Sequence, residues 1–534
     1  MSLASFLFQK ALLPFRESWI ARSRELSVCV ECQEKTLLTL IRNASRTQFG
    51  LDHHFSSVRS VSEYQKSVPI RSYEDFFNDS FRPAGEAAAK RLKIFYDPNQ
   101  ASPYLENVTW PGLVPFFALS SGTTSGKTKF IPLTRELIRS NRRAGIDTAV
   151  FHFLRNPKTG ALSGKTFLLG GNLSLRSDWN GKVESGDLSG VLARELPFFC
   201  RSLYFPGKQI GSIADWEEKM DRAAEAGLKD NLTVLGGVPS WVLLFLETLN
   251  QKRNFKGNIK SIWPNFELFI HGGISFEPYR EQFRAWLGPE TYFEEVYPSS
   301  EAFIAIEDPR EKALRLMVDY GTFYEFVPVE ELSGKNPTRL TLTDIETDQN
   351  YAIVLTTNGG LWSYLLGDTV RFLSKEPLLL KVTGMTKYFL SAFGEHVIQE
   401  EIETALHRTC SEQKTTFIDY HAAPIFPSGE SPVGRHQYLI EFVKSPTDLK
   451  QFVSAFDRCL QTLNEDYAAH RSGDYGMREP EIMGLPQGFF RLWMKKKGKL
   501  GAQHKVPRIS GDRDLIDDML GFLRSTENFL ERTI

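Results

Sequence analysis

Residues 119–134 read LSSGTTSGKTKFIPLT, after an apolar run and before a helical pattern. The seven positions from Ser120 to Gly126 hold two glycines and five Ser or Thr residues. Small hydroxylated residues let backbone N–H groups and hydroxyls close around phosphate oxygens, and Lys127 or Lys129 adds positive charge. The segment therefore predicts a phosphate-binding loop. A surface turn rich in small residues is the alternative.

A Walker A loop is the obvious competitor for this segment. That motif has four residues between its first glycine and the Gly-Lys-Ser/Thr group, whereas three residues separate Gly122 from Gly126. The same shortfall occurs between Gly160 and Gly164. Because one missing residue changes which N–H groups point inward, both segments argue against a P-loop kinase or ATPase. We interpret the second one as a surface turn.

The composition is that of an ordinary globular protein. The 534 residues are 41% hydrophobic and 24% charged, which excludes a collagen, a coiled coil or a disordered chain. Lys and Arg total 64 against 65 Asp and Glu, so the formal charge of −1 creates no overall field toward nucleic acid or an anionic membrane. The apolar runs are far shorter than the roughly 20 residues that cross a bilayer, and the first residues make a poor signal peptide. We expect a soluble, cytoplasmic protein.

The five cysteines are too few for a disulfide scaffold and are typical of a reducing compartment. Cys29 and Cys32 form a CxxC pair. No second pair follows at zinc-binding spacing, and no nearby strand suggests a redox unit. We interpret the pair as part of an ordinary helix.

Strand-length apolar runs alternate with helical patterns over most of the chain. The expected strands are Thr166–Leu169, Thr233–Gly236, Leu268–His271, Arg339–Thr343 and Ala352–Thr356. The expected helices are Arg135–Asn156, Trp216–Gly227, Ser240–Leu249 and Tyr279–Leu287. This alternation predicts a large α/β region. After about Thr383 the pattern becomes a compact α+β one, so we place a boundary near residues 383–386, with Gly384 as a candidate hinge.

A carboxylate beside hydroxyls marks a second motif, Tyr297–Glu301, which reads YPSSE and precedes the apolar stretch Ala302–Ile306. Mg²⁺ is usually held by one or two carboxylates together with substrate phosphates, so the motif suits a shared magnesium ion. Ser-Ser-Glu is also a common helix N-cap pattern. Taken by itself, the motif favours that structural role.

Two further motifs carry polar groups suited to a nucleotide. Tyr364–Asp368 reads YLLGD after the turn Asn358–Gly360, and an Asp at a tight turn can accept both hydroxyls of a ribose or be an ordinary turn residue. Between Arg491 and Arg508 there are seven basic residues and no acidic one. A solvated charge run is the default interpretation and a nucleic-acid patch the alternative. The glycines and Pro507-Arg508 instead suggest a shaped loop that delivers a lysine to an anion.

Together and in this order, the motifs resemble the auxin-responsive Gretchen Hagen family of acyl-acid amido synthetases, in particular its bacterial branch. That family belongs to the adenylate-forming superfamily. The segments that carry the likeness are Gln33–Phe49, Val68–Glu74, Gly237–Trp241, His271–Ile274, Tyr324–Pro328, Ser391–Glu395 and His504–Arg508, with the motifs above. The resemblance implies an α/β fold with a large ATP- and acyl-binding domain of mixed sheets and helices (1–383). It also implies a smaller mobile α+β C-terminal domain (384–534) and a hinge near 383–386. We expect a monomer.

The resemblance implies a two-step reaction. A carboxylic acid attacks the α-phosphate of MgATP to give an acyl adenylate and pyrophosphate, and an amine, usually from an amino acid, then displaces AMP to form an amide. Because carboxylate and phosphate repel each other, the enzyme must neutralise charge and hold the reactants in line. ATP and Mg²⁺ are therefore the expected cofactors. The expected partners are small-molecule acids and amino acids, without nucleic acid or membrane.

The family roles carry over to named positions. The residues that would cradle phosphate oxygens are Ser120, Ser121, Gly122, Thr123, Thr124 and Lys129. Those that would surround the rest of the nucleotide are Tyr297, Ser299, Ser300, the adenine-side Gly272 and Gly273, and the ribose-binding Asp368. Glu301 would hold Mg²⁺. Lys505 would be the mobile catalytic lysine that stabilises charge during adenylation.

Two departures from the family pattern leave alternatives open. The family commonly has Arg where this chain has Ser363, and again after the hinge glycine, where this chain has Met385. Loss of two cations would weaken ATP binding or alter closure, so a catalytically weakened nucleotide- or acyl-binding protein is one alternative. An acyl-CoA ligase of the same superfamily is another. In the acyl pocket, one of Arg139, Arg142 and Arg143 is a candidate for pairing with a substrate carboxylate, although we favour a surface role.

Overall fold

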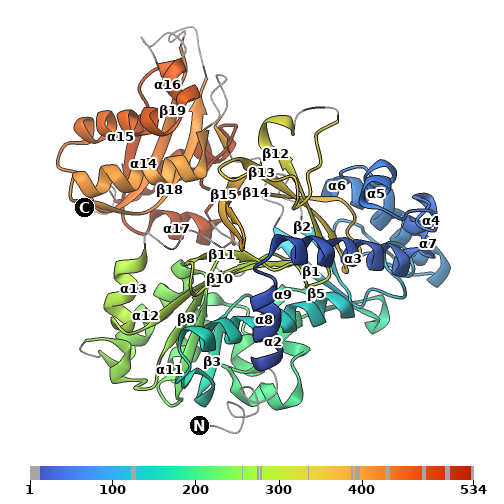
Figure 1. Cartoon of the computed structure of the whole chain (residues 1–534). Coiled ribbons are helices and arrows are strands. Elements are labelled where there is room, and N and C mark those ends of the chain that lie inside the picture. The colour runs from blue at the N-terminus through green and yellow to red at the C-terminus, as the bar shows by residue number, and fades with distance from the viewer. Residues whose placement is uncertain are drawn as a thin grey trace. The chain divides into compact units, whose positions relative to one another are not determined.

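A computed structural model of the chain describes residues 13–121, 128–254, 257–273, 276, 279–332, 334, 336–386, 389–390, 397–426, 433–471, 477–499 and 506–530. The chain forms two compact units (Figure 1). The first unit comprises Met1–Leu366 and Arg371–Lys381, and the second comprises Gly367–Val370 and Val382–Ile534. The candidate hinge residue Gly384 therefore lies at the start of the long segment of the second unit, with φ of 151°.

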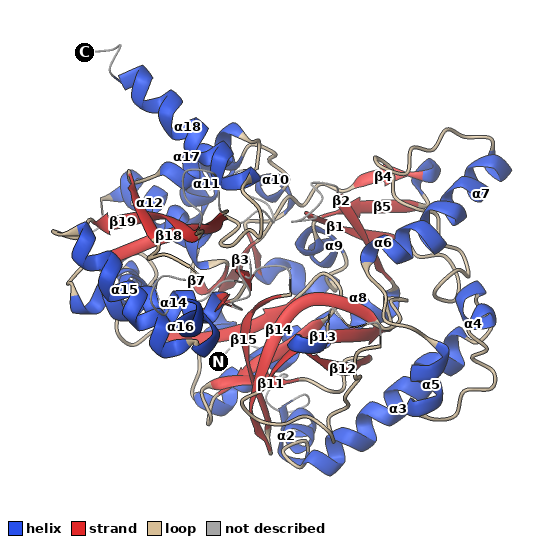
Figure 2. Cartoon of the chain, turned by 90° about the horizontal axis from the view of Figure 1, so that it is seen from above, coloured by secondary structure: helices blue, strands red, loops and turns tan. Residues whose placement is uncertain are grey.

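A mixed sheet forms the centre of the first unit. Within the described residues it has eleven strands in the order β12-β13-β14-β15-β11-β10-β9-β8-β7-β3-β6, several of which Figure 2 shows side by side. Their bounds are β3 (Lys165–Leu169), β6 (Tyr204–Phe205), β7 (Leu232–Gly237), β8 (Leu268–His271), β9 (Tyr292–Pro298), β10 (Phe303–Asp308), β11 (Ala313–Leu316), β12 (Thr322–Pro328), β13 (Asn350–Thr357), β14 (Tyr364–Lys375) and β15 (Leu378–Met385). Strands β6, β3, β7, β8 and β9 pair in parallel, whereas β10 pairs antiparallel with both β9 and β11.

Helices connect and cover this sheet. Those between the parallel strands are α11 (Trp216–Gly227), α12 (Pro239–Arg253) and α13 (Arg280–Leu287). The long helix α8 (Arg135–Arg155) packs on β10, and its N-cap Thr134 accepts a hydrogen bond from the N–H of Leu137. The other helices of the unit are α2 (Leu13–Arg22), α3 (Leu26–Ala44), α4 (Gln48–Asp52), α5 (Val61–Ser67), α6 (Tyr73–Phe76), α7 (Arg82–Leu92), α9 (Leu188–Arg194) and α10 (Lys208–Gly211). The alternation of strands and helices predicted an α/β fold, and this prediction is confirmed.

A second, smaller sheet of the first unit has the order β2-β1-β5-β4. Its strands are β1 (Phe116–Ser121), β2 (Thr128–Leu133), β4 (Arg176–Asp178) and β5 (Val183–Gly186). The inward side chains of β1 and β2 join a hydrophobic cluster with residues of α3, α6 and the start of β14. This cluster ties the quoted segment to the strand that carries the YLLGD motif.

The second unit is built on the sheet β18-β19-β20, which consists of Thr416–Ile425, Arg435–Lys444 and Glu481–Leu485. Helices α14 (Gln399–Glu412) and α15 (Leu449–Leu463) lie side by side and pack on one set of its side chains (Figure 1). Helices α17 (Phe489–Lys496) and α18 (Asp514–Leu530) pack with another set. The remaining elements are β16 (Phe389–Leu390), β17 (Val397–Ile398) and α16 (Glu465–Arg471).

One expected strand is absent from the structure. Of the stretch Arg339–Thr343, only Leu340 makes an isolated bridge, with Phe326, and the chain then turns. The turn forms because Thr341 donates both its N–H and its hydroxyl to the Asp344 carboxylate. The prediction of a strand at Arg339–Thr343 is therefore wrong, because the Thr341–Asp344 hydrogen bonds form a turn there.

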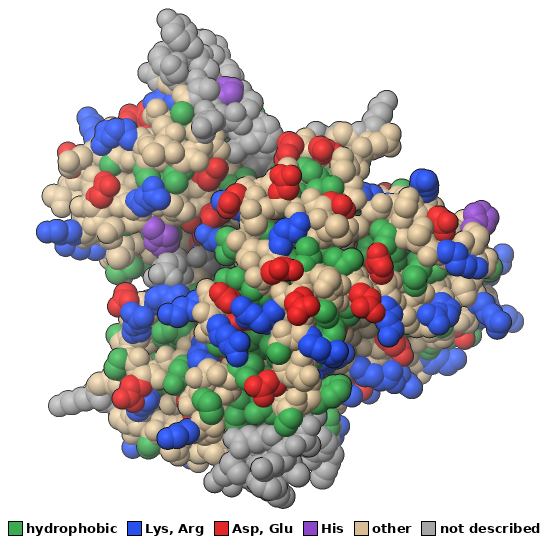
Figure 3. Space-filling view, viewed as in Figure 1, with side chains coloured by type: hydrophobic (Ala, Val, Ile, Leu, Met, Phe, Trp, Pro, Cys, Tyr) green, Lys and Arg blue, Asp and Glu red, His purple; other side chains and the backbone are tan. Residues whose placement is uncertain are grey.

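Two further features considered in the sequence are the surface charge and the cysteine pair. Acidic and basic side chains are interspersed over the face shown in Figure 3. Cys29 and Cys32 lie on α3 as free thiols, and burial raises their pKa values to about 12 and about 11. The pair therefore belongs to an ordinary helix, as predicted. Within the described part of the chain, no helix has both the length and the apolar character required to span a bilayer.

Candidate functional site

The quoted Ser/Thr-rich segment connects the two strands of a β-hairpin. Ser120 pairs with Lys129, and Ser121 pairs with Thr128, across antiparallel β1 and β2. The predicted phosphate contacts Gly122, Thr123 and Thr124 lie outside the described residues. A Walker A loop is followed directly by a helix, whereas here β2 intervenes and α8 begins only at Arg135. The segment 119–134 does lead into a helix, as expected, because its last residue, Thr134, is the N-cap of α8. The strand β2 between the glycines and that helix strengthens the argument against a Walker A loop.

Tyr73 fixes the base of this hairpin and the position of Lys129. The Tyr73 hydroxyl accepts a hydrogen bond of 2.8 Å from the N–H of Phe130, next to Lys129 in the chain. The Lys129 Nζ lies 5.4 Å from the centroid of the Tyr73 ring, at cation–π distance. Burial raises the pKa of Tyr73, so its hydroxyl stays protonated. Lys129 is therefore held opposite Ser120, where both flank the loop.

The carboxyl ends of β8 and β9 bring together Gly272, Gly273 and Tyr297. The two strands are parallel, with His271 opposite Glu295. A Cβ on Gly272 would lie 2.2 Å from the carbonyl oxygen of Val296, so only glycine fits there. Tyr297 is 8% exposed on β9. Ligands of open α/β sheets bind outside the carboxyl ends of parallel strands, so this edge suits the predicted nucleotide.

A buried histidine precedes this glycine pair, and the sequence analysis assigned it no separate role. The His271 ring stacks on Phe276, with centroids 3.9 Å apart. Burial, followed by the positive charges of Arg280 and Arg155, lowers the pKa of His271 to about 3. The imidazole is therefore neutral near pH 7 and acts as an apolar support for the end of β8.

The Ser-Ser-Glu sequence lies in the turn between β9 and β10. The Ser299 N–H and hydroxyl both donate to the carbonyl of Ala302, at 2.8 and 2.9 Å, and the Ser299 hydroxyl accepts from the Ala302 N–H at 3.0 Å. The helix N-cap interpretation is therefore wrong, because strand β10 follows the motif. Ser300 occupies the same turn, half-buried, and Ser299 shapes it through its own hydroxyl.

Glu301 ends this turn as a buried carboxylate with a phenol donor. Its side chain is 7% exposed, and the Tyr364 hydroxyl donates to Glu301 Oε1 at 3.1 Å. Burial, reinforced by the negative charge of Glu301, raises the pKa of Tyr364 well above its usual range. A single hard carboxylate suits Mg²⁺ when phosphates and water complete the coordination. Among the residues that the structure describes, no group of three or more His, Cys, Asp or Glu side chains offers a complete metal site.

Tyr364 also links the Glu301 turn to the hairpin. Tyr364, Tyr73 and Phe130 belong to one hydrophobic cluster, and the Tyr364 ring centroid lies 6.2 Å from that of Phe76. The β1–β2 hairpin and the Glu301 turn therefore share one packed support inside the first unit.

The remaining predicted residues belong to the second unit. Asp368 lies on β14 within Gly367–Val370, where the N–H of Thr386 donates to the carbonyl of Gly367 at 2.6 Å. Lys505 lies outside the described residues. Directly after it, the carbonyl of Pro507 is 2.6 Å from His421 Nδ1, and Ile509 pairs with Ala422 of β18. The chain that follows Lys505 is thus anchored to the sheet of its own unit.

Several cations singled out in the sequence are paired within the chain. Arg508, which is 7% exposed, binds Asp419 at 2.9 Å and Glu403, so the basic segment is not a uniformly solvated run. The acidic partners of the α8 arginines are Glu136 for Arg139, Glu195 for Arg142 and Asp319 for Arg143. These pairs favour the surface role expected for the three arginines. Met385 packs against the core of the second unit.

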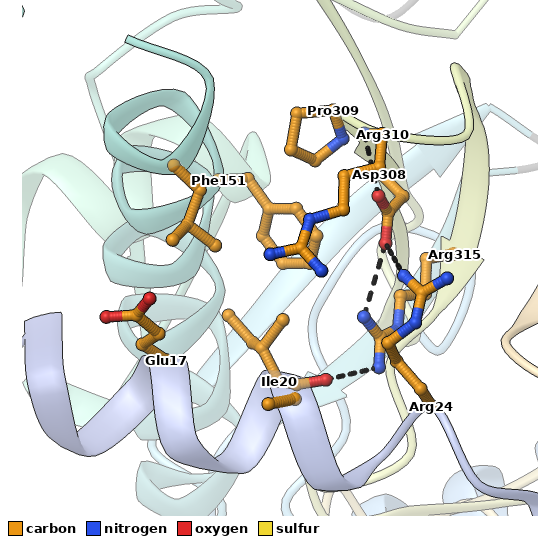
Figure 4. A pocket seen from close by; sticks show the side chains of 10 residues that line it. Glu17, Ile20, Arg24, Phe151, Asp308, Pro309, Arg310 and Arg315 are labelled. Carbon is orange, nitrogen blue, oxygen red and sulfur yellow. Dashed lines mark hydrogen bonds and ion pairs between the residues drawn. The ribbon is translucent and has the colours of Figure 1, made fainter. Parts of the chain in front are cut away.

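A small cavity between α2, α8 and the turn after β10 is a poor ligand site (Figure 4). Its volume is about 60 Å³, whereas ligand pockets usually measure roughly 300–1,000 Å³. The Asp308 carboxylate beside it is paired with Arg315 at 3.2 Å and with Arg24 at 3.7 Å. The cavity has room for water only.

Comparison with known proteins gives matches along most of the chain. Sequence models of the GH3 family match in three parts: the N-terminal domain at residues 24–84, 102–172 and 172–291, the central domain at 315–383 and the C-terminal domain at 400–514. Jasmonoyl-L-amino acid synthetase JAR4 from Nicotiana attenuata is 24% identical over 472 residues, covering 73% of this chain and 75% of the relative. Indole-3-acetic acid-amido synthetase GH3.4 from Arabidopsis thaliana is 22% identical, covering 89% of this chain and 88% of the relative.

Solved structures share the fold. The GH3.15 acyl acid amido synthetase superposes with a TM-score of 0.74 at 17% identity, covering 97% of this chain and 96% of that protein. The 2-hydroxyisobutyryl-CoA ligase in its postadenylation state gives a TM-score of 0.55 at 12% identity, covering 92% and 91%. The architecture described above is therefore that of known adenylate-forming enzymes.

Proposed function

Because the chain belongs to the GH3 family, we propose that it is an ATP-dependent acyl-acid amido synthetase, which joins a small carboxylic acid to an amino acid. The family resemblance inferred from the motifs is confirmed. The collinear family match from residue 24 to residue 514 carries this proposal. Relatives named jasmonoyl-amino acid and indole-3-acetic acid-amido synthetases support the substrate class of acid plus amino acid.

The proposed reaction has two balanced steps. In the first, a carboxylate oxygen of the acid attacks the α-phosphorus of ATP, the bond from that phosphorus to the bridging oxygen breaks, and pyrophosphate leaves. In the second, the amine nitrogen attacks the acyl carbon, the acyl carbon–oxygen bond breaks, AMP leaves with its electron pair, and the amine loses a proton. The protein must position these reactants and offset negative charge in both steps.

The site residues divide into four tasks. Ser120, Ser121, Gly122, Thr123 and Thr124 would cradle phosphate oxygens, with Lys129 as their cation. Gly272 and Gly273 would lie against adenine, Tyr297, Ser299 and Ser300 would shape the nucleotide site, and Asp368 would bind the ribose hydroxyls.

Charge is handled by two further groups. Glu301 would hold Mg²⁺, which when bound supplies positive charge to the phosphates. The buried Glu301 carboxylate with its phenol donor fits such a cation. Lys505 would stabilise the negative charge that develops during adenylation. We further propose that the protein works as a cytoplasmic monomer without nucleic-acid or membrane partners.

An acyl-CoA ligase is the second candidate, since the fold also matches a CoA ligase. Pyrophosphate release should be measured with a panel of carboxylic acids, with amino acids, with CoA and with neither. We expect acid-dependent release and an amide product with an amino acid. A CoA thioester as product favours the second candidate. ATP binding without acid-dependent release across the panel would show a binding protein and overturn the enzyme proposal.

Lys505 provides a residue-level test of the same proposal. Lys505→Ala should greatly slow adenylate formation while leaving ATP binding intact. The matched control is Lys499→Ala, an exposed lysine of the same basic segment, which should leave the rate unchanged. An unchanged adenylation rate in Lys505→Ala removes the catalytic role assigned to Lys505.

A further inference from the structure

Ser363, which stands where the family commonly has arginine, is fixed on every side. It is 0% exposed and has a left-handed φ of 46°. Its N–H donates to Thr356 Oγ1 at 3.0 Å, its hydroxyl donates to the Tyr64 hydroxyl at 2.9 Å, and its carbonyl accepts from the Arg71 N–H at 2.9 Å. Arg339 donates to the Ser363 hydroxyl at 2.6 Å. These four contacts determine the direction in which the next residue enters β14.

That next residue is Tyr364, and it has little freedom of its own. The Leu365 N–H donates to the Arg71 carbonyl at 2.8 Å, so the backbone is held on both sides of Tyr364. The Tyr364 side chain is 0% exposed and packs beside Phe76. A phenol with two rotatable side-chain bonds, both locked by packing, presents its O–H at one place.

The place that the phenol reaches is Glu301 Oε1, 3.1 Å away and 63 residues earlier in the chain. Glu301 ends a turn, and rotation about its last side-chain bond sets where its two carboxylate oxygens lie. A hydrogen bond to one oxygen restricts that rotation and so helps to set the direction of the second oxygen. Carboxylates that bind metals are commonly oriented by such hydrogen bonds, and removal of the partner typically costs 10–100-fold in metal affinity or activity.

We propose that Tyr364 is a positioning residue that holds the Glu301 carboxylate in the orientation needed to bind the divalent cation of the ATP complex. This inference rests on the proposed function, because Glu301 has a cation to bind only if the chain binds metal-ATP. Tyr364 touches neither cation nor nucleotide in this role and acts through Glu301. Through Tyr364, the hydrogen bonds that fix Ser363 also contribute to the orientation of Glu301.

The test uses Tyr364→Phe, which removes one oxygen and keeps the buried ring. Binding of Mn²⁺ is titrated by electron paramagnetic resonance on the full chain with α,β-methylene-ATP, which cannot be adenylated. We expect Mn²⁺ to bind about tenfold more weakly or worse. The matched control is Tyr324→Phe, another 0% exposed tyrosine, whose hydroxyl donates to the carbonyl of Met317. It should bind Mn²⁺ as the wild type does.

A double-variant experiment distinguishes a positioning role of Tyr364 from a purely structural one. In a Glu301→Gln background, Tyr364→Phe should have no further effect on Mn²⁺ binding, because the phenol acts through Glu301. In the active enzyme, the Mg²⁺ concentration for half-maximal rate should rise while kcat at saturating Mg²⁺ approaches the wild-type value. Equal Mn²⁺ affinity in wild type and Tyr364→Phe overturns the inference, as does an equal loss in both Glu301 backgrounds. Failure of the wild type to bind Mn²⁺ with the nucleotide instead overturns the proposed function.

Discussion

Removal of Arg339 is expected to loosen the support of the candidate site. Its guanidinium binds Glu325 with two hydrogen bonds, at 2.9 and 2.8 Å, and Glu325 is 0% exposed. It also donates to the carbonyls of Gln65 and Val68, at 3.0 and 2.6 Å, and to the Ser363 hydroxyl. Arg339→Met keeps an unbranched apolar stem and removes all five donated bonds.

The expected loss of stability follows from the Glu325 carboxylate, which stays buried without its cation. Breaking a buried ion pair by deleting one partner costs about 3–5 kcal/mol, because the other charge stays buried. Unfolding entropy is about 2.1 cal/mol/K per residue, or about 0.8 kcal/mol/K for a first unit of roughly 380 residues. The Tm of that unit should therefore fall by about 4–6 °C. Arg339→Met/Glu325→Leu removes both charges and should recover most of this loss.

Calorimetry is the suitable assay, because two compact units can unfold in separate transitions. The control is Arg284→Met, which breaks the exposed Arg284–Glu281 pair of 2.9 Å. Exposed pairs contribute about 1 kcal/mol or less, so its Tm should fall by no more than about 1 °C. An Arg339→Met protein with the wild-type Tm, or a double variant no more stable than the single one, would refute the reasoning.

Two other predictions concern the end of β8. Gly272→Ala should abolish acid-dependent pyrophosphate release, since its Cβ would collide with the Val296 carbonyl oxygen, whereas Gly145→Ala in open space on α8 should not. Retained release in Gly272→Ala contradicts the close packing. His271 has a folded pKa of about 3 against about 6.5 unfolded, so its contribution to stability is complete above pH 6.5 and is lost as pH falls toward 3. Between pH 6.5 and 4.5 the wild type should lose about 2–3 kcal/mol more than His271→Gln. Thermal unfolding at the two pH values checks this. As a control, His54→Gln, at an exposed position, should lose as much stability as the wild type between the two pH values. If His271→Gln is as acid-sensitive as the wild type, the role assigned to His271 is wrong.

The sequence predicted best the helices and strands that are specified by residues within or next to the element itself. Helix α11 was expected at Trp216–Gly227 and has those bounds, because Asp215 caps it and its apolar residues face inward. Strand β2 was missed because Pro132 interrupts its pattern. The structure places β2 at the edge of the small sheet, where proline is tolerated. The position of a strand within its sheet depends on residues distant in sequence.

The candidate site shows the same difference between what local sequence predicts and what depends on residues distant in the chain. Glycine at 272 could be anticipated from a motif, and the structure supplies the reason, the carbonyl of Val296. The contact between Tyr364 and Glu301 could not be anticipated, since neither residue type nor spacing encodes a hydrogen bond across 63 residues. Ser299 stays a predicted nucleotide-site residue, and the structure adds that its hydroxyl closes its own turn. Motifs thus nominate candidate residues, whereas the atoms that those residues contact within the chain are known only from the structure.

Ser363 shows how a departure from a family pattern acquires its meaning from the structure. From the sequence, serine in place of arginine reads as a lost cation. In the structure a cation is already present, because Arg339 reaches the Ser363 hydroxyl from elsewhere in the chain, and its charge is balanced by Glu325. A second guanidinium at this 0% exposed position would lie beside the first without a second carboxylate described there.

Restoring the family residue should therefore damage this protein. Ser363→Arg must bury an extra charge and displace the hydrogen bonds to Tyr64 and Arg339, so we expect a lower Tm and weaker Mn²⁺ binding with α,β-methylene-ATP. Ser363→Arg/Arg339→Ser exchanges the positions of cation and hydroxyl and should be less damaging than Ser363→Arg alone. Gain of stability or metal affinity in the single variant would mean that the serine is a true loss. In that case the Arg339–Ser363 contact does not replace the cation common in the family.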